Sequence, residues 1–87
     1  MRVNMVQKYT VYDAGKDDYD RYNLVFNTPV KAGNGTLSHH GVTVTKKREV
    51  KFFYYPASIF AATDFGQAIE LKDLPLHVRC IFEEFTV

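Results

Sequence analysis

The stretch of sequence that decides the fold is residues 66–87, which read GQAIELKDLPLHVRCIFEEFTV. Apolar residues recur here at the spacing of one helical face, at Leu74, Val78, Ile81, Phe82 and Phe85. These positions span an arc of about 100° of a helix. Asp73 suits the N-cap, and Pro75 is tolerated in a first helical turn because the N–H that it lacks has no partner there. The pattern predicts one C-terminal helix that buries a single face against the rest of the chain.

Upstream of this helix, β-branched and aromatic residues predict strands, at residues 7–12, 21–26, 42–45 and 49–55. The first two strands are close in sequence, so we expect them to pair as an antiparallel hairpin across a turn rich in aspartate. Residues 57–65 are too short and too mixed to predict an element. The fold class is therefore α+β, a small, mainly antiparallel sheet of four or five strands with one C-terminal helix packed on it.

The run at 49–55 is apolar on both of its faces, and Pro56 ends it. A strand of this kind is typical of the middle of a sheet, where both faces are covered. We therefore expect a central strand, with the helix packed over Val50, Phe52 and Tyr54. A central strand that is apolar on both sides also predicts a homodimer through the second face of the sheet.

Composition limits the function classes that the chain can serve. Its 87 residues predict one domain, 1–87, and 46% hydrophobic residues are enough for a core of modest size. A net charge of +1 favours neither a strong non-specific nucleic-acid binder nor an acidic mimic of DNA. The single cysteine, Cys80, has no internal disulfide partner, and no signal segment or long apolar run occurs. These features predict a cytoplasmic protein that does not enter a membrane.

Two groups of residues have types that bind metals. Four aspartates, Asp13, Asp17, Asp18 and Asp20, offer oxygen ligands, but the order D-x-D-x-D-G and the closing glutamate of a calcium loop are missing. The helix places His77, Cys80 and Glu84 on one flank, where a zinc site would need a second cluster. We interpret the aspartates as a solvated turn and the helix flank as polar surface, and we expect no metal.

Catalytic signatures are likewise missing from the sequence. Cys80 lies inside the predicted helix, away from the N-terminal end where a helix lowers the pKa of a thiol. No G-x-S-x-G, G-x-G-x-x-G or G-x-x-x-x-G-K-[ST] motif occurs, and residues 33–36 indicate a turn rather than a phosphate loop. We therefore expect no enzyme activity and no cofactor.

A binding surface is predicted on the loops. Residues 27–41 form the longest segment without a predicted element, and irregular segments of more than about 12–15 residues are usually mobile or functional. A basic turn follows the next strand, and the aspartate-rich turn is a second choice. The expected partner-binding residues are Asn34, Leu37, His39, His40, Lys46, Lys47, Arg48, Asp17 and Asp18.

An alternative is the binding of single-stranded nucleic acid or a nucleotide. The basic residues 46–48 and Lys51 lie beside Phe53 and Tyr55, and small sheets bind single strands by stacking bases on strand aromatics flanked by cations. The near-zero net charge and the missing glycine-containing aromatic motif of such sheets argue against this alternative.

Two segments carry a resemblance to a known family. The first reads YDRYNLVF at residues 19–26, and the second reads GQAIELKDLP at residues 66–75 with Val78 following. Together they resemble small accessory proteins of tailed bacteriophages, a family of no established activity. The segment Ser38-His39-His40-Gly41 departs from the family, whose members have a proline-rich, phenylalanine-containing stretch there.

The resemblance covers about half of the chain and implies a setting rather than a site. It implies an accessory protein acting in the cytoplasm of a bacterial host. Together with small size, it leads to the expectation of a protein that binds and inhibits a host protein or complex, foremost an antiviral defence component such as a CRISPR effector.

Overall fold

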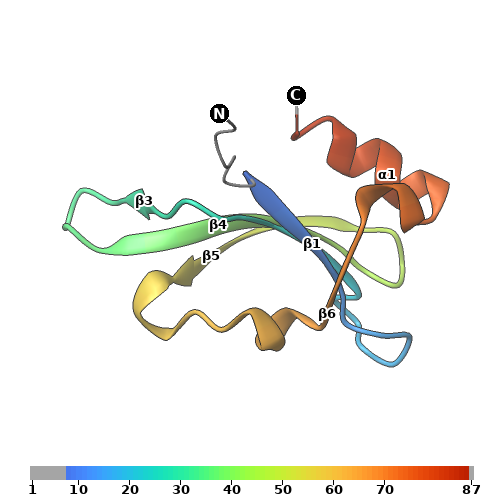
Figure 1. Cartoon of the computed structure of the whole chain (residues 1–87), viewed down its shortest axis with the longest axis horizontal. Coiled ribbons are helices and arrows are strands. Elements are labelled where there is room, and N and C mark those ends of the chain that lie inside the picture. Colours follow the sequence, from blue (N-terminus) through green and yellow to red (C-terminus); the bar gives the residue numbers. More distant parts are fainter. Residues whose placement is uncertain (1–7, 87) are drawn as a thin grey trace, which may run out of the picture.

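The computed structural model describes residues 8–86 as one antiparallel sheet with an α-helix on one face (Figure 1). The strands are β1 (Tyr9–Asp13), β2 (Tyr22–Phe26), β3 (Val30–Lys31), β4 (Leu37–Val44), β5 (Val50–Pro56) and β6 (Gln67–Ile69). The helical segments are the 3-10 turns η1 (Ala57–Ile59), η2 (Ala62–Phe65) and η3 (Leu71–Asp73), and the α-helix α1 (Leu76–Glu83). The predicted α+β class is confirmed, and the short strands β3 and β6 extend the sheet beyond the expected strands.

Strand order follows from the pairings. The order β6-β1-β2-β4 is antiparallel throughout, and β4 also pairs with β3 and, along its other edge, with β5. The predicted hairpin of the first two strands is confirmed, with Val11 opposite Leu24. In Figure 1, α1 lies on one side of the sheet, and the segment from η1 to η2 lies on the other side.

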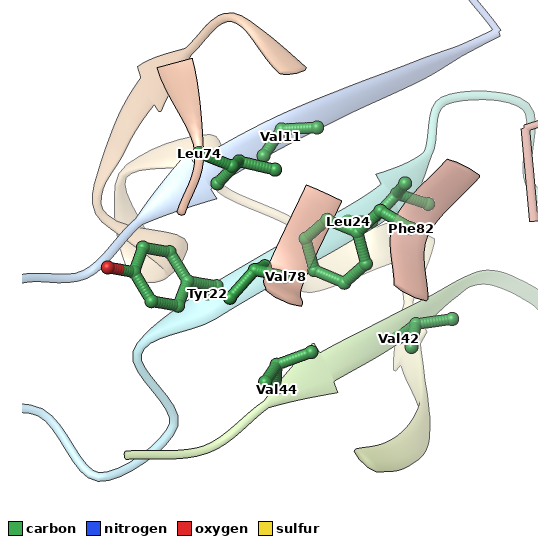
Figure 2. Close-up of a cluster of buried hydrophobic side chains, with 8 residues drawn as sticks. All are labelled: Val11, Tyr22, Leu24, Val42, Val44, Leu74, Val78 and Phe82. Carbon is green, nitrogen blue, oxygen red and sulfur yellow. The ribbon is translucent and has the colours of Figure 1, made fainter. Parts of the chain in front are cut away.

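The main core lies between α1 and the sheet. Figure 2 shows its buried side chains, which come from three strands, the turn before the helix and the helix itself: Val11, Tyr22, Leu24, Val42, Val44, Leu74, Val78 and Phe82. The helix side chains Val78 and Phe82 are completely buried. The buried helical face is therefore the predicted one, while Ile81 and Phe85 lie at its margin and are only partly buried.

A second, smaller cluster covers the other face of the sheet. Tyr12 and Val25 pack there against Phe65 of η2, with Phe53, Tyr55 and Phe60 around them. The chain between η2 and β6 passes so close to β1 that a Cβ at Gly66 would lie 2.4 Å from the Asp13 carbonyl oxygen. Gly66 also has φ +102°, a region that favours glycine. The segment that sequence left without an element thus covers the second face.

The helix begins later than predicted. Asp73 lies in the 3-10 turn η3 and is not the N-cap; α1 begins at Leu76, after Pro75. The reason lies in Pro75, because a residue before proline is disfavoured in the helical region. Leu74 accordingly has φ −75° and ψ 152°, which is extended backbone.

The prediction that residues 27–41 contain no secondary structure is also wrong in part. Within this segment, β3 and β4 form a hairpin whose turn has Gly35 at φ +87°, with the Gly35 N–H donating to the Ala32 carbonyl at 2.9 Å. His39 and His40 therefore lie in a strand. The first half of β4 escaped prediction because Ser38, His39, His40 and Gly41 supply no apolar side chain, and β3 escaped because it has only two residues.

The position predicted for the run 49–55 is wrong. Among the described strands only β4 pairs with β5, so β5 is an edge strand and not a central one. Val50, Phe52 and Tyr54 do face the side of α1, but they are 42%, 70% and 75% exposed. The helix has eight residues and is about 12 Å long, so it covers β1, β2 and β4 and leaves this part of β5 open. The prediction of a homodimer through the second face of the sheet assumed that this strand is central, so the structure removes the reason for that prediction.

No helix within residues 8–86 has the length and apolar character needed to cross a bilayer.

We predict that Phe82→Ala lowers the free energy of unfolding by about 3–5 kcal/mol, because Phe82 is completely buried and truncation leaves a cavity. The matched control Leu76→Ala changes a residue of the same helix that is 64% exposed, and its effect should stay within about 0.5 kcal/mol. Urea denaturation followed by circular dichroism measures both. A loss below about 1 kcal/mol for Phe82→Ala would contradict the packing described here.

Candidate functional site

The part of the sheet that α1 leaves open carries a group of aromatic side chains. Phe52 and Tyr54 of β5 lie on the same side of the sheet as His40 and Val42 of β4, because these residues are paired across the strands. Val30 of β3 joins the same side through its pairing with Ser38. We call this surface the aromatic face and define it as Phe26, Val30, His40, Phe52, Tyr54 and Phe85.

Two pairs of rings are in contact within the aromatic face. The Phe52 and Phe85 rings meet edge to face with centroids 5.5 Å apart, and the His40 and Tyr54 rings do the same at 4.6 Å. Two hollows adjoin here, one beside Val30 and one between Phe52 and Phe85, and both are lined by His40 and Tyr54. The two ring pairs border the same hollow, so the exposed rings of Phe52 and Tyr54 and the partly buried rings beside them form one continuous surface.

A basic turn lies at one end of β5. Lys46, Lys47 and Arg48 are all exposed, and Arg48 closes the turn at φ +65° with its N–H donating to the Thr45 carbonyl at 2.9 Å. The neighbouring acid Glu49 accepts hydrogen bonds from the hydroxyls of Tyr19 and Thr45. The bond from Tyr19 to Glu49 raises the pKa of the Tyr19 phenol. The turn thus presents three cations just before the Val50 end of β5, the strand that carries Phe52 and Tyr54.

Three carboxylates of the aspartate-rich turn, those of Asp13, Asp18 and Asp20, bind groups of the same chain. Arg21 pairs with Asp13, with Nε 3.1 Å from Oδ1, and Lys51 pairs with Asp20 at 2.8 Å. The Asp18 carboxylate accepts the Asp20 N–H at 3.0 Å, as in an Asx turn. Within residues 8–86, no three histidine, cysteine or acidic side chains are grouped closely enough to hold a metal ion.

A hollow on the opposite face has a mixed lining. Phe53 and Tyr55 of β5 border it together with Asp20 and Asp64. The Tyr55 hydroxyl donates to Asp64 at 2.6 Å, which raises the pKa of the phenol, and the Lys51–Asp20 pair lies at the same hollow. The Tyr55–Asp64 bond therefore holds η2 against β5, and the Lys51–Asp20 pair holds the aspartate-rich turn against it.

The structure places the predicted partner-binding residues in two distant groups. Asn34 and Leu37 lie at the β3–β4 end of the sheet, and the basic turn lies at the other end of β4, roughly 25 Å away for eight strand residues. Asp17 and Asp18 lie on the loop beside the basic turn, where the Lys46 N–H donates to the Tyr19 carbonyl at 2.8 Å.

The two adjacent histidines point to opposite sides of the sheet. His39 is 8% exposed, stacks on Phe60 at 4.1 Å, and has Nδ1 2.9 Å from the Phe26 carbonyl oxygen. His39 therefore belongs to the second, smaller cluster and is not part of an exposed binding surface. His40 lies on the aromatic face beside Tyr54.

Sequence reasoning missed the most exposed apolar residues, Phe52 and Tyr54. An edge strand with one open face and a central strand with two covered faces have the same apolar pattern. Two signals for an edge were present, because lysine and proline are typical of edge strands and β5 contains Lys51 and ends at Pro56.

Comparison of the chain with protein-family models, with curated proteins and with solved structures gives no match.

We predict a pH-dependent contribution from the pair of Asp13 and Arg21. The Arg21 guanidinium lowers the pKa of Asp13 below its ordinary value of 3.8, so the pair stabilises the fold fully above that value and is lost as pH falls through the lowered pKa. Asp13→Asn removes the charge and keeps an oxygen for the Gly15 N–H. The difference in urea midpoint between wild type and Asp13→Asn should be largest at about pH 7 and shrink towards about pH 2–3.

Asp17→Asn is the matched control for this pH experiment, because Asp17 lies exposed on the same turn. It should leave the urea midpoint nearly unchanged at both ends of the pH range. A difference between wild type and Asp13→Asn that stays constant from neutral to acidic pH would argue against the ion pair.

Proposed function

We propose that this chain is an interaction protein that binds and inhibits a bacterial host factor, with an antiviral defence component such as a CRISPR effector as the foremost target class. The observation that carries the proposal is the exposure of Phe52 and Tyr54, at 70% and 75%, on a continuous aromatic face. Exposed apolar surface of this kind typically marks a binding site, and aromatic residues are enriched where protein interfaces bury most surface.

The charges around the aromatic face indicate the chemistry of the partner. Lys46, Lys47 and Arg48 lie exposed at the end of β5, while the nearby acids Asp20 and Glu49 are engaged within the chain. A partner surface with an apolar centre and an acidic rim would match this arrangement, because complementary charges steer association and suppress wrong partners. The likeness of two segments to phage accessory proteins supports the bacterial cytoplasm as the setting. Binding alone, without catalysis, would account for inhibition.

A second candidate, single-stranded nucleic-acid binding, is favoured by one observation. Phe52 and Tyr54 stand exposed on the same strand that follows the basic turn, which is the arrangement of a stacking platform. The aromatics differ from the expected ones, because Phe53 and Tyr55 turn to the other face and contact Phe65 at 5.5 and 5.2 Å.

We predict that Tyr54→Ala weakens target binding by about thirtyfold or more, because truncating an aromatic hot-spot residue in an interface removes about 2 kcal/mol or more. The tagged protein is expressed in bacteria with an active CRISPR system, and phage plating measures inhibition while affinity capture measures retained components. Wild type and the exposed control Leu76→Ala should raise plating equally, and Tyr54→Ala should lose the effect. No rise in plating with wild type, together with no saturable retention of any host protein, would refute the proposal.

The nucleic-acid candidate is tested separately with the purified protein. A fluorescently labelled oligothymidine is titrated at two salt concentrations, and anisotropy reports binding. Saturable binding that weakens with salt, and that is lost on joint replacement of Lys46, Lys47 and Arg48 by alanine, would favour this second function over the first.

A further inference from the structure

The outer edge of β5 is open along the strand. Within residues 8–86 only β4 pairs with β5, and β5 has seven residues, whereas β3 and β6 have two and three. Long edges without protection are places where another chain adds a strand. The sole charged residue within β5 is Lys51, and its ammonium is held by Asp20 at 2.8 Å. The centre of β5 therefore lacks the charges and prolines that usually block edge pairing.

The hairpin turn shows which main-chain groups face β4. The Thr45 N–H donates to the Glu49 carbonyl at 2.9 Å and the Glu49 N–H donates to Thr45 Oγ1 at 3.0 Å, so the two residues stand at a hydrogen-bonded position of the ladder. Hydrogen-bonded and non-hydrogen-bonded pairs alternate along an antiparallel ladder. In the register of this hairpin, the next hydrogen-bonded positions on β5 are Lys51, Phe53 and Tyr55.

The remaining residues of β5 direct their main-chain groups to the open edge. By the same alternation these are Val50, Phe52, Tyr54 and Pro56. Pro56 fits this assignment, because proline has no N–H to donate to β4. The N–H and C=O groups of Val50, Phe52 and Tyr54 are therefore available to a further strand.

We propose that β5 pairs antiparallel with β5 of a second copy of this chain, with Phe52 at the two-fold axis. In this register Phe52 lies opposite Phe52 of the partner subunit, and Val50 lies opposite the partner's Tyr54. Every outward N–H and C=O of the three residues then has a partner. The result is one continuous sheet through both copies, with an isologous interface.

The alternative symmetric register, centred on Phe53, is poorer. It places Pro56, which has no N–H, opposite Val50 and leaves the Val50 carbonyl without a donor. The register centred on Phe52 also places an aromatic residue opposite a β-branched one, which is among the favourable cross-strand pairs. It sets Lys51 opposite the partner's Phe53, so no like charges face each other.

The exposed surface limits how tightly the copies associate. A phenylalanine or tyrosine side chain offers about 150–250 Å² when fully buried, and Phe52 and Tyr54 are 70% and 75% exposed. The patch on β5 thus supplies at most a few hundred Å² per copy, less than the roughly 800 Å² per partner of a standard interface. We therefore expect a reversible dimer with a dissociation constant between about 1 µM and 1 mM.

This inference stands apart from the proposed inhibition, because it is tested on the purified protein alone. Sedimentation equilibrium over the stated concentration range should show the mass rising from the 10.0 kDa monomer towards twice that value. Phe52→Pro removes the central outward N–H without touching a bond to β4, and it should shift the association at least about tenfold to higher concentration. Leu76→Glu changes an exposed leucine on α1 and should associate as wild type does.

A charge exchange tests the register itself. Because Phe52 faces its own copy at the two-fold axis, Phe52→Lys alone and Phe52→Glu alone should both be monomeric through like-charge repulsion. An equimolar mixture of the two variants should form a heterodimer, visible by native mass spectrometry and weakened by salt. Far-UV circular dichroism and thermal melting confirm that each variant is folded.

Three results would overturn the proposal. One is a wild-type protein that stays monomeric over the whole concentration range, which would leave the edge to another partner. Another is a dimer that Phe52→Pro and Phe52→Lys leave intact. The third is a mixture of Phe52→Lys and Phe52→Glu, both folded, that does not associate more than either variant alone.

Discussion

The contact on which the structure depends is the burial of Leu74, Val78 and Phe82 against the sheet. These side chains come from the turn before α1 and from the helix, and they cover Val11, Leu24, Val42 and Val44 of three strands. An eight-residue helix can cover only this width of sheet. The same contact that completes the core therefore determines which strand is left open, and the aromatic face follows from the shortness of the helix.

The strand that α1 leaves open, β5, is held in place by contacts on the opposite face of the sheet. Phe53 lies so closely over Gly41 that a Cβ there would come within 2.1 Å of its ring, and it stacks on Phe65 at 5.5 Å. The Tyr55 hydroxyl is bonded to Asp64. Alternate residues of β5 are thus anchored on one side, which leaves Phe52 and Tyr54 free to be exposed on the other. Phe52 and Tyr54 are thus exposed on a strand whose alternate residues are packed in place.

Much of the fold could be predicted from local pattern, and the errors have physical causes. Strand-forming residues predicted the hairpin of β1 and β2, and helical spacing identified the buried face of α1. The helix start was predicted too early because Pro75 keeps Leu74 extended, an effect that N-cap preference for Asp73 concealed. The β3–β4 hairpin was missed because β3 has two residues and the first half of β4 is mostly polar, although β4 is paired on both of its edges.

The candidate site was harder to predict than the fold. Which apolar face of β5 is covered depends on the length of α1 and on the path of residues 57–65, and neither is encoded in β5 itself. The predicted histidines show the same dependence, since His39 and His40 are adjacent in sequence but face a core and a surface, respectively. Tertiary context alone separates their roles.

The aromatic face and the edge of β5 use different groups of the same residues, and this separation matters for function. Side chains of Phe52 and Tyr54 point out of the sheet, whereas their N–H and C=O groups point along it. A strand added at the edge would leave the outer surfaces of the rings accessible and would place the rings of two copies beside each other. The surface available to a larger partner would then be contributed by both copies, and its two-fold symmetry would favour targets that present the same acidic, apolar patch twice or along an extended surface.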